Sequence, residues 1–160
     1  MSPSPAQVDP SNTLVVAVDP GKVTGIAVWD PAELGNRPGA YEVPSRVKVY
    51  RVFDDIVSWG RPGTVVIERF TIKPGVVNTN QPDALMIIGA IESTATRVGW
   101  PVEFQLPAAA MSWATNERLR RVGWWVRGKE HANDALRHLL LWTYAHNLLP
   151  EEIKEVVRGG

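Results

Sequence analysis

The sequence predicts a single α/β domain built on a five-stranded mixed β-sheet flanked by helices. Three observations predict it: two short apolar stretches that each end in a carboxylate, a hairpin pattern after the first of them, and amphipathic helical stretches that follow. A length of 160 residues, 44% hydrophobic and 21% charged, suits one globular domain with its own core.

The strands are expected from apolar runs bounded by turn residues. TLVVAVD is apolar on both faces, which is typical of a strand in the middle of a sheet, and the Pro-Gly that follows starts a tight turn to its hairpin partner. GTVVIERF repeats the pattern of a β-branched run that reaches a carboxylate. The expected strands are residues 13–19, 26–30, 40–44, 63–70 and 101–107.

The helices are expected from periodicity and capping residues. Ser45 is the expected N-cap of a helix that Gly60 ends, and apolar residues with a period near 3.6 follow a loop at 71–83. The stretch before Pro150 is rich in Ala and Leu and is the strongest helix prediction. The expected helices cover residues 46–59, about 84–98 and 131–149, and one or two more helices cover about 108–122.

Composition sets the expected boundaries and location. Residues 1–12 are rich in Pro and Ser and are expected to form a flexible arm before a domain at 13–150 and a C-terminal tail at 151–160. No basic and apolar leader starts the sequence, and no apolar run is long enough to cross a bilayer. The absence of cysteine excludes a thiolate metal site and fits a reducing compartment, so we expect a cytoplasmic protein without a membrane partner.

Four metal-ligating residue types lie at ends of predicted elements. Asp19 and Glu68 end two strands, and His131 and Asp134 are three residues apart on the last helix, so they share a face. If these elements converge, the four side chains form an oxygen-rich site with one imidazole, which suits Mg²⁺ or Mn²⁺. Two such ions would supply an activated water and charge stabilisation for phosphodiester hydrolysis, with His131 either as a ligand or as the group that positions or deprotonates the water.

Each of these residues also has a structural interpretation. Asp19 precedes Pro-Gly and could cap a turn, and Glu68 could pair with an arginine. Asp134 near a helix start favours the helix dipole, and His131 could simply be the N-terminal end of that helix. His138 lies four residues beyond Asp134 and is interpreted as a packed or solvent-exposed histidine.

Basic residues are concentrated although the net charge is zero. Twelve of the 17 Lys and Arg lie within residues 45–73 and 116–137, so one face could bind a polyanion, although two solvated helix surfaces would show the same pattern.

Four motifs in order resemble the RuvC-like Holliday junction resolvases of the ribonuclease H-like superfamily. VVAVDPGKVTGIAVW resembles the first hairpin of that family, VVIERF the strand that delivers the second acid, NTNQPDALMIIGAI the following segment, and HANDALRHLLL the closing helix. The resemblance covers roughly residues 13–149. The first hairpin alone is weakly specific, because actin-like ATPases share it.

The resemblance implies a ribonuclease H-like fold and a divalent-metal-dependent endonuclease that resolves four-way junctions in DNA recombination and repair. It implies that Asp19, Glu68, His131 and Asp134 bind two Mg²⁺ or Mn²⁺ ions and are catalytic. It also implies a homodimer formed through the helix after Glu68. The lysines that the family places before the last helix are not plainly matched, and a compact chain of this kind suggests a bacteriophage-encoded member acting on branched DNA more broadly.

Phosphate contacts are expected from basic residues near this site, and Phe70 could stack on an unpaired base or belong to the core. The candidate DNA-binding residues are Arg69, Phe70, Lys73, Arg118, Arg120, Arg121, Arg127 and Lys129. The competing hypotheses are a catalytically silent branched-DNA-binding protein and an actin-like ATP-binding domain. The short chain disfavours the ATP-binding domain.

Overall fold

A computed structural model describes residues 12–32, 37–72, 75 and 81–159. The expected N-terminal arm, apart from Asn12, and the candidate DNA-binding residue Lys73 lie outside these described residues.

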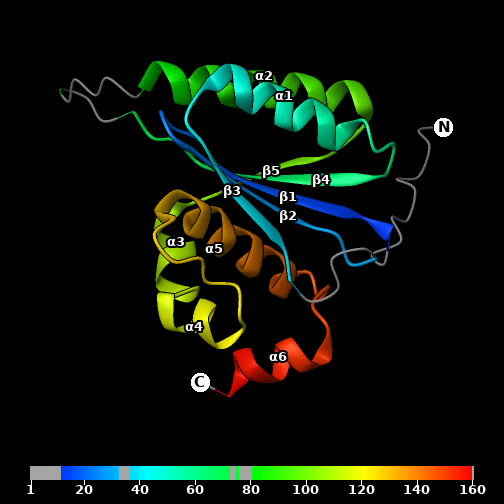
Figure 1. Cartoon of the computed structure of the whole chain (residues 1–160), viewed down its shortest axis with the longest axis vertical. Helices are drawn as coiled ribbons and strands as arrows, with labels where there is room; N and C mark the ends of the chain where they lie inside the picture. Colours follow the sequence, from blue (N-terminus) through cyan, green and yellow to red (C-terminus); the bar gives the residue numbers. More distant parts are fainter. Residues whose placement is uncertain (1–11, 33–36, 73–74, 76–80, 160) are drawn as a thin grey trace.

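The five predicted strands are present in one mixed sheet, which confirms the predicted architecture (Figure 1). The order across the sheet is β3-β2-β1-β4-β5. β1 pairs antiparallel with β2 and β2 with β3, whereas β4 runs parallel to both β1 and β5. The bounds are β1 Leu14–Asp19, β2 Thr24–Trp29, β3 Gly39–Val43, β4 Gly63–Glu68 and β5 Val102–Gln105.

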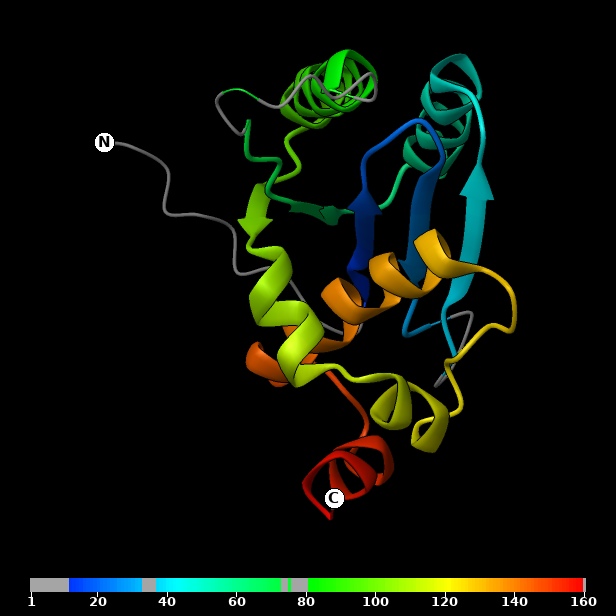
Figure 2. The same cartoon turned by 90° about the vertical axis from the view of Figure 1, so that its left-hand side faces the viewer.

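Helices cover both faces of the sheet, as Figures 1 and 2 show from two directions. α1 and α2 pack on one face, and α5 crosses the other face, with α3, α4 and α6 beyond it. No helix in the described part of the chain is long and apolar enough to cross a membrane. The bounds are α1 Arg46–Val57, α2 Gln81–Val98, α3 Pro107–Trp113, α4 Asn116–Arg121, α5 Glu130–Ala145 and α6 Glu151–Arg158.

β1 separates two cores. Val15 and Ala17 face the core that contains α5, and Val16 and Val18 face the core that contains α1 and α2. All six residues of β1 are buried because neighbouring strands flank it on both edges and helices cover both faces. This burial explains why the strand is apolar at every position until Asp19.

The last predicted helix is shorter than expected, and the segment after it is ordered. α5 ends at Ala145 rather than near residue 149, because Asn147 adopts a left-handed backbone conformation with φ of 59° that ends a helix. Residues 151–158, expected to belong to a C-terminal tail, form α6. Its Ile153 and Val157, one turn apart, are buried in the same core as α5.

Candidate metal centre

A row of neighbouring residues, one from each strand, crosses the sheet at the edge where β1 and β4 end in Asp19 and Glu68. The β1–β4 ladder ends one residue before Asp19 and Glu68, so the two carboxylates leave adjacent parallel strands at the same edge. Asp19 pairs with Gly25, Gly25 with Glu42, and Glu68 with Gln105. Every member lies against α5 between His131 and His138, so the first half of α5 rests on this row.

The first turn of α5 approaches the sheet very closely at Gly25. A Cβ atom on Gly25 would lie 1.8 Å from the carbonyl oxygen of His131 and 3.1 Å from the nitrogen of Ala132. Both are backbone atoms, which cannot rotate away. Only glycine therefore allows the turn that carries His131 to lie against β2.

A carboxylate from the edge strand β3 caps α5. The backbone N–H of His131 donates to Oε1 of Glu42 at 3.0 Å, and Nζ of Lys129 lies 3.7 Å from Oε2 of the same side chain. Lys129, at the N-cap position, makes no capping hydrogen bond with its own side chain. Glu42 thus satisfies a free N–H at the helix start and places negative charge at the positive end of the helix dipole.

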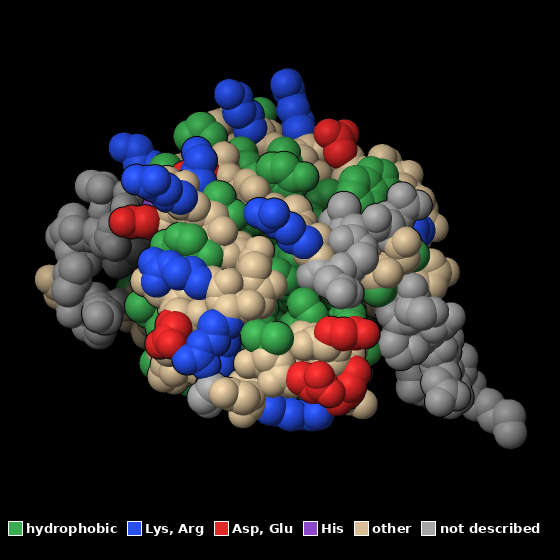
Figure 3. Space-filling model, turned by 60° about the horizontal axis from the view of Figure 1, so that its bottom comes forward, with side chains coloured by type: hydrophobic (Ala, Val, Ile, Leu, Met, Phe, Trp, Pro, Cys, Tyr) green, Lys and Arg blue, Asp and Glu red, His purple; other side chains and the backbone are tan. Residues whose placement is uncertain are grey.

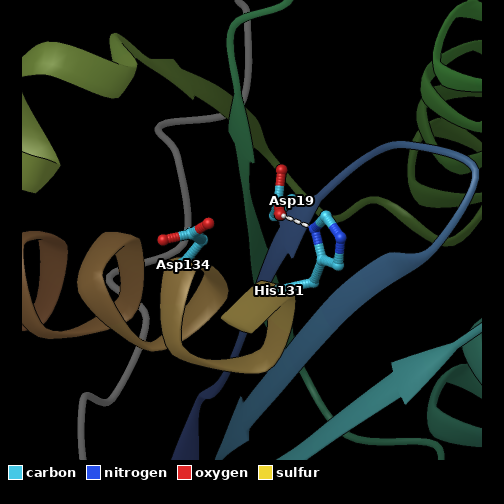
Figure 4. Close-up of side chains that lie close together, drawn as sticks. All are labelled: Asp19, His131 and Asp134. Atoms are coloured by element: carbon cyan, nitrogen blue, oxygen red, sulfur yellow. Dashed lines mark hydrogen bonds and ion pairs between the residues drawn. The ribbon is translucent and has the colours of Figure 1, made fainter. Parts of the chain in front are cut away.

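Asp19, His131 and Asp134 meet at the end of β1, as Figure 4 shows. One ligand atom from each lies within 4.8 Å of the others, and Nδ1 of His131 is 3.0 Å from Oδ2 of Asp19. Ligands of a divalent transition metal lie about 2.1 Å from the ion, so atoms on opposite sides of it are about 4.2 Å apart. A small inward movement would let these two carboxylates and one imidazole hold a divalent cation.

The site holds more negative charge than its surroundings stabilise. The pKa of Asp19 is raised from 3.8 to about 6, mainly by burial and then by the nearby carboxylates of Glu68 and Asp134, while the hydrogen bond with His131 opposes the rise. Burial also raises the pKa of Asp134, with Glu68 adding to the rise and Arg137 opposing it. A divalent cation would relieve this repulsion, so the chemistry of the donor set fits such an ion.

Glu68 lies beside the three-residue group and is not part of it. Its Oε2 is 2.9 Å from Nε2 of His138, so its hydrogen-bond partner is a histidine and not the arginine weighed as an alternative. The charge of Glu68 acts on both Asp19 and Asp134, which places the carboxylate near both. That Glu68 ligates a metal stays a prediction.

Arg137 holds Asp134 and was not expected at the site. Its side chain is buried and donates hydrogen bonds to Oδ1 of Asp134 and to Oδ1 of Asn116 on α4. The i,i+3 spacing of Asp134 and Arg137 was the sequence signal that could have revealed this pair. His138, four residues after Asp134, shares its helix face, but its contact with Glu68 depends on the position of β4.

Comparison with known proteins rests on structure alone, because no protein-family model and no curated protein sequence match this chain. The structure of Thermus thermophilus RuvC in complex with a Holliday junction substrate matches with a TM-score of 0.64 and 18% identity, over 84% of this chain and 96% of that chain. A second structure of Thermus thermophilus RuvC matches with a TM-score of 0.60 and 17% identity, over 84% and 97%. The chain has the fold of RuvC. The predicted ribonuclease H-like fold is therefore confirmed.

In this RuvC fold, three candidate DNA-binding arginines belong to α4 and are engaged with neighbours. The guanidinium of Arg118 lies 4.7 Å from the ring centroid of Trp113 and donates to the carbonyl of that residue. Arg120 stacks 4.5 Å from the ring centroid of Trp125. Arg121 pairs with the carboxylate of Glu117.

The remaining described candidates lie near the ends of the elements that form the candidate metal centre. Arg127 and Lys129 are exposed in the segment that leads into α5, Arg69 is exposed directly after β4, and Phe70 is half-buried. Figure 3, which brings the side with α4 and α6 forward, shows Lys and Arg side chains spread over this face with acidic side chains among them.

Adding Mg²⁺ or Mn²⁺ is expected to raise the Tm more at pH 7.5 than at pH 5. The pKa of Asp19 is 3.8 unfolded and about 6 folded, so the free energy of unfolding of the metal-free protein falls as pH rises through this interval. At pH 5 a cation must displace the proton. At pH 7.5, with the metal at about 100 times its Kd, we expect the Tm to rise by about 5 to 10 °C.

The measurement is calorimetry in EDTA and in metal, with KCl of equal ionic strength as the control. Equal shifts at both pH values would contradict the assignment of Asp19 as a ligand.

Proposed function

We propose that this protein is a divalent-metal-dependent endonuclease that nicks four-way DNA junctions, with a role in DNA recombination and repair. The observation that carries the proposal is the meeting of Asp19, His131 and Asp134, next to Glu68, on the fold of RuvC. One structure with this fold is RuvC in complex with a Holliday junction substrate, and the same substrate class is proposed here.

The residues that would hold two Mg²⁺ or Mn²⁺ ions are those four. In this proposal Asp19 would bind both ions, Glu68 would bind one of them, and His131 and Asp134 would bind the other. Such ions supply a nucleophilic water of lowered pKa and neutralise charge on the leaving oxygen.

The side chains of this protein would orient the ligands and accept the proton. Asp19 is held by Nδ1 of His131, and Asp134 by Arg137, so two carboxylates are oriented before substrate binds. The side chain of His131 is 45% exposed, which leaves the imidazole accessible to a substrate. His131 can therefore serve as a ligand or accept a proton from the attacking water.

A homodimer is part of the proposal, because two symmetric nicks in one junction need two sites. α2, the helix expected to form the interface, exposes Leu85 and Met86, which are 46% and 51% exposed. These two adjacent side chains would form part of the proposed interface. Sedimentation equilibrium of the wild-type protein should give a mass of two chains.

The test is cleavage of an end-labelled four-way junction. We expect paired nicks with Mg²⁺ or Mn²⁺, none with EDTA, and a shifted but uncut junction with Asp19→Asn. A wild-type protein that only shifts the junction would support a silent DNA-binding protein. ATP hydrolysis without DNA cleavage would support an actin-like ATP-binding domain.

Removing the charge of Arg127 is expected to weaken junction binding about fivefold and to lower its salt dependence by about one unit of slope. Arg127 is exposed in the segment before α5, four residues before His131 of the proposed metal centre. The affinity of Arg127→Ala is measured by fluorescence anisotropy at several salt concentrations with Asp19→Asn as the background, so that no DNA is cut.

The matched control is Arg97→Ala, an exposed arginine in the last turn of α2 on the opposite layer. Equal losses of affinity in Arg97→Ala and Arg127→Ala would contradict a localised DNA face.

A further inference from the structure

A buried histidine joins the ends of β4 and β5 next to the metal centre. His138 is 0% exposed, its Nε2 lies 2.9 Å from Oε2 of Glu68, and its Nδ1 lies 2.9 Å from Oε1 of Gln105. Glu68 and Gln105 are direct partners in the β4–β5 ladder, so both side chains leave the sheet on the face toward α5. The imidazole of His138 is therefore held on one side by Glu68 and on the other by Gln105.

The chemistry of the two contacts fixes the hydrogen on Nε2. A carboxylate oxygen accepts hydrogen bonds, so Nε2 of His138 donates to Glu68. The amide of Gln105 can present either its oxygen or its nitrogen to Nδ1. In both arrangements Nε2 carries hydrogen, and the ring is held in one orientation.

Packing alone does not require a polar residue here. The neighbours of His138 one turn before and one turn after it on the same face of α5 include Ala135 and Trp142, and both are buried in the core. A buried imidazole is stable only when its nitrogens are hydrogen-bonded, and the two partners available are Glu68 and Gln105. The hydrogen bond to Glu68 therefore explains why a histidine occupies this buried position.

We propose that His138, oriented by Gln105, is the positioning residue for Glu68: it holds Oε2 at the end of β4 and leaves Oε1 as the oxygen that receives a divalent cation. The inference rests on the proposed metal-dependent function. The nearness of Glu68 to Asp19 and Asp134, seen in its electrostatic effect on both, supports it.

Loss of the contact is expected to weaken metal binding. The side chain of Glu68 is 23% exposed, so without His138 it would be free to turn toward solvent. Removing the hydrogen-bond partner of a ligand typically lowers metal affinity about 10- to 100-fold.

The test compares two amides at one position in the full chain without DNA. In His138→Gln the amide nitrogen reaches the place of Nε2 and can donate to Glu68, whereas in His138→Asn it reaches only the place of Nδ1. We measure the Kd for Mn²⁺ by electron paramagnetic resonance of the free ion, and folding by circular dichroism. His138→Gln should bind within about threefold of wild type, and His138→Asn about tenfold more weakly or worse.

Gln105→Leu keeps the test decisive if both histidine variants unfold, because Gln105 is only half-buried. It should also weaken Mn²⁺ binding, by a smaller factor. Unchanged Mn²⁺ affinity in His138→Asn or in Gln105→Leu would overturn the inference, as would equal losses in His138→Asn and His138→Gln. In those cases Asp19→Asn would still lose Mn²⁺, and the proposed function would stand. A wild-type protein that binds Mn²⁺ no better than Asp19→Asn would overturn both.

Discussion

Asp19→Asn is expected to stabilise the metal-free protein while removing its cleavage activity. The pKa of the buried Asp19 carboxyl rises from 3.8 to about 6 on folding, so above pH 6 its charge lowers the free energy of unfolding by about 3 kcal/mol. The uncharged amide removes this cost at pH 7. It also removes a proposed metal ligand, and we expect junction cleavage to fall about a thousandfold, which corresponds to about 4 kcal/mol of transition-state stabilisation.

Urea unfolding in EDTA at pH 7 and single-turnover cleavage in Mn²⁺ measure the two effects. Asp30→Asn is the matched control, because Asp30 is also a buried carboxylate but pairs with Arg61. Its loss should lower the free energy of unfolding by about 3 kcal/mol and leave the metal-dependent rise in Tm intact. An Asp19→Asn protein that is less stable than wild type, or that still cleaves, would contradict the proposed site.

Gly25→Ala is expected to destabilise the protein and to impair the site together. The new Cβ atom would lie 1.8 Å from the carbonyl oxygen of His131, so the first turn of α5 must move away from β2. We expect a loss of about 3 kcal/mol from the free energy of unfolding. A displacement of His131 by about 1 Å from Asp19 should lower cleavage about a hundredfold in the molecules that remain folded.

Unfolding by urea and cleavage at saturating Mn²⁺ measure these losses. Gly89→Ala in α2 is the control for stability, because a Cβ atom there meets nothing within 4 Å. Alanine favours a helix over glycine by about 1 kcal/mol, so this variant should be more stable than wild type. Wild-type stability in Gly25→Ala would show that α5 does not rest on β2 as described.

The strands were predictable because their signals are local. β1 is apolar at every position until Asp19 because it lies between β2 and β4 under helices on both faces, and that burial is visible in the sequence. The order of α6 was not predictable in the same way. Its eight residues form too short a helix to be stable alone, and the burial of Ile153 and Val157 depends on the core that they join.

Three of the candidate metal ligands were also predictable from local sequence patterns, whereas the residues that support them were not. Asp19 ends a buried strand, and His131 and Asp134 share a helix face, so a pattern of chemistry and spacing indicates all three. Glu42 and Gln105 reach α5 only through strand register, which links residues far apart in the chain. Register is set by the assembled sheet, and no short motif encodes it.

The contact between Asp19 and His131 joins residues 112 positions apart. Synthesis on the ribosome produces β1 early and α5 late, so a growing chain carries the carboxylate long before the imidazole emerges. Each carboxylate alone binds divalent ions weakly, and the candidate metal centre is therefore complete only after α5 has docked onto the finished sheet.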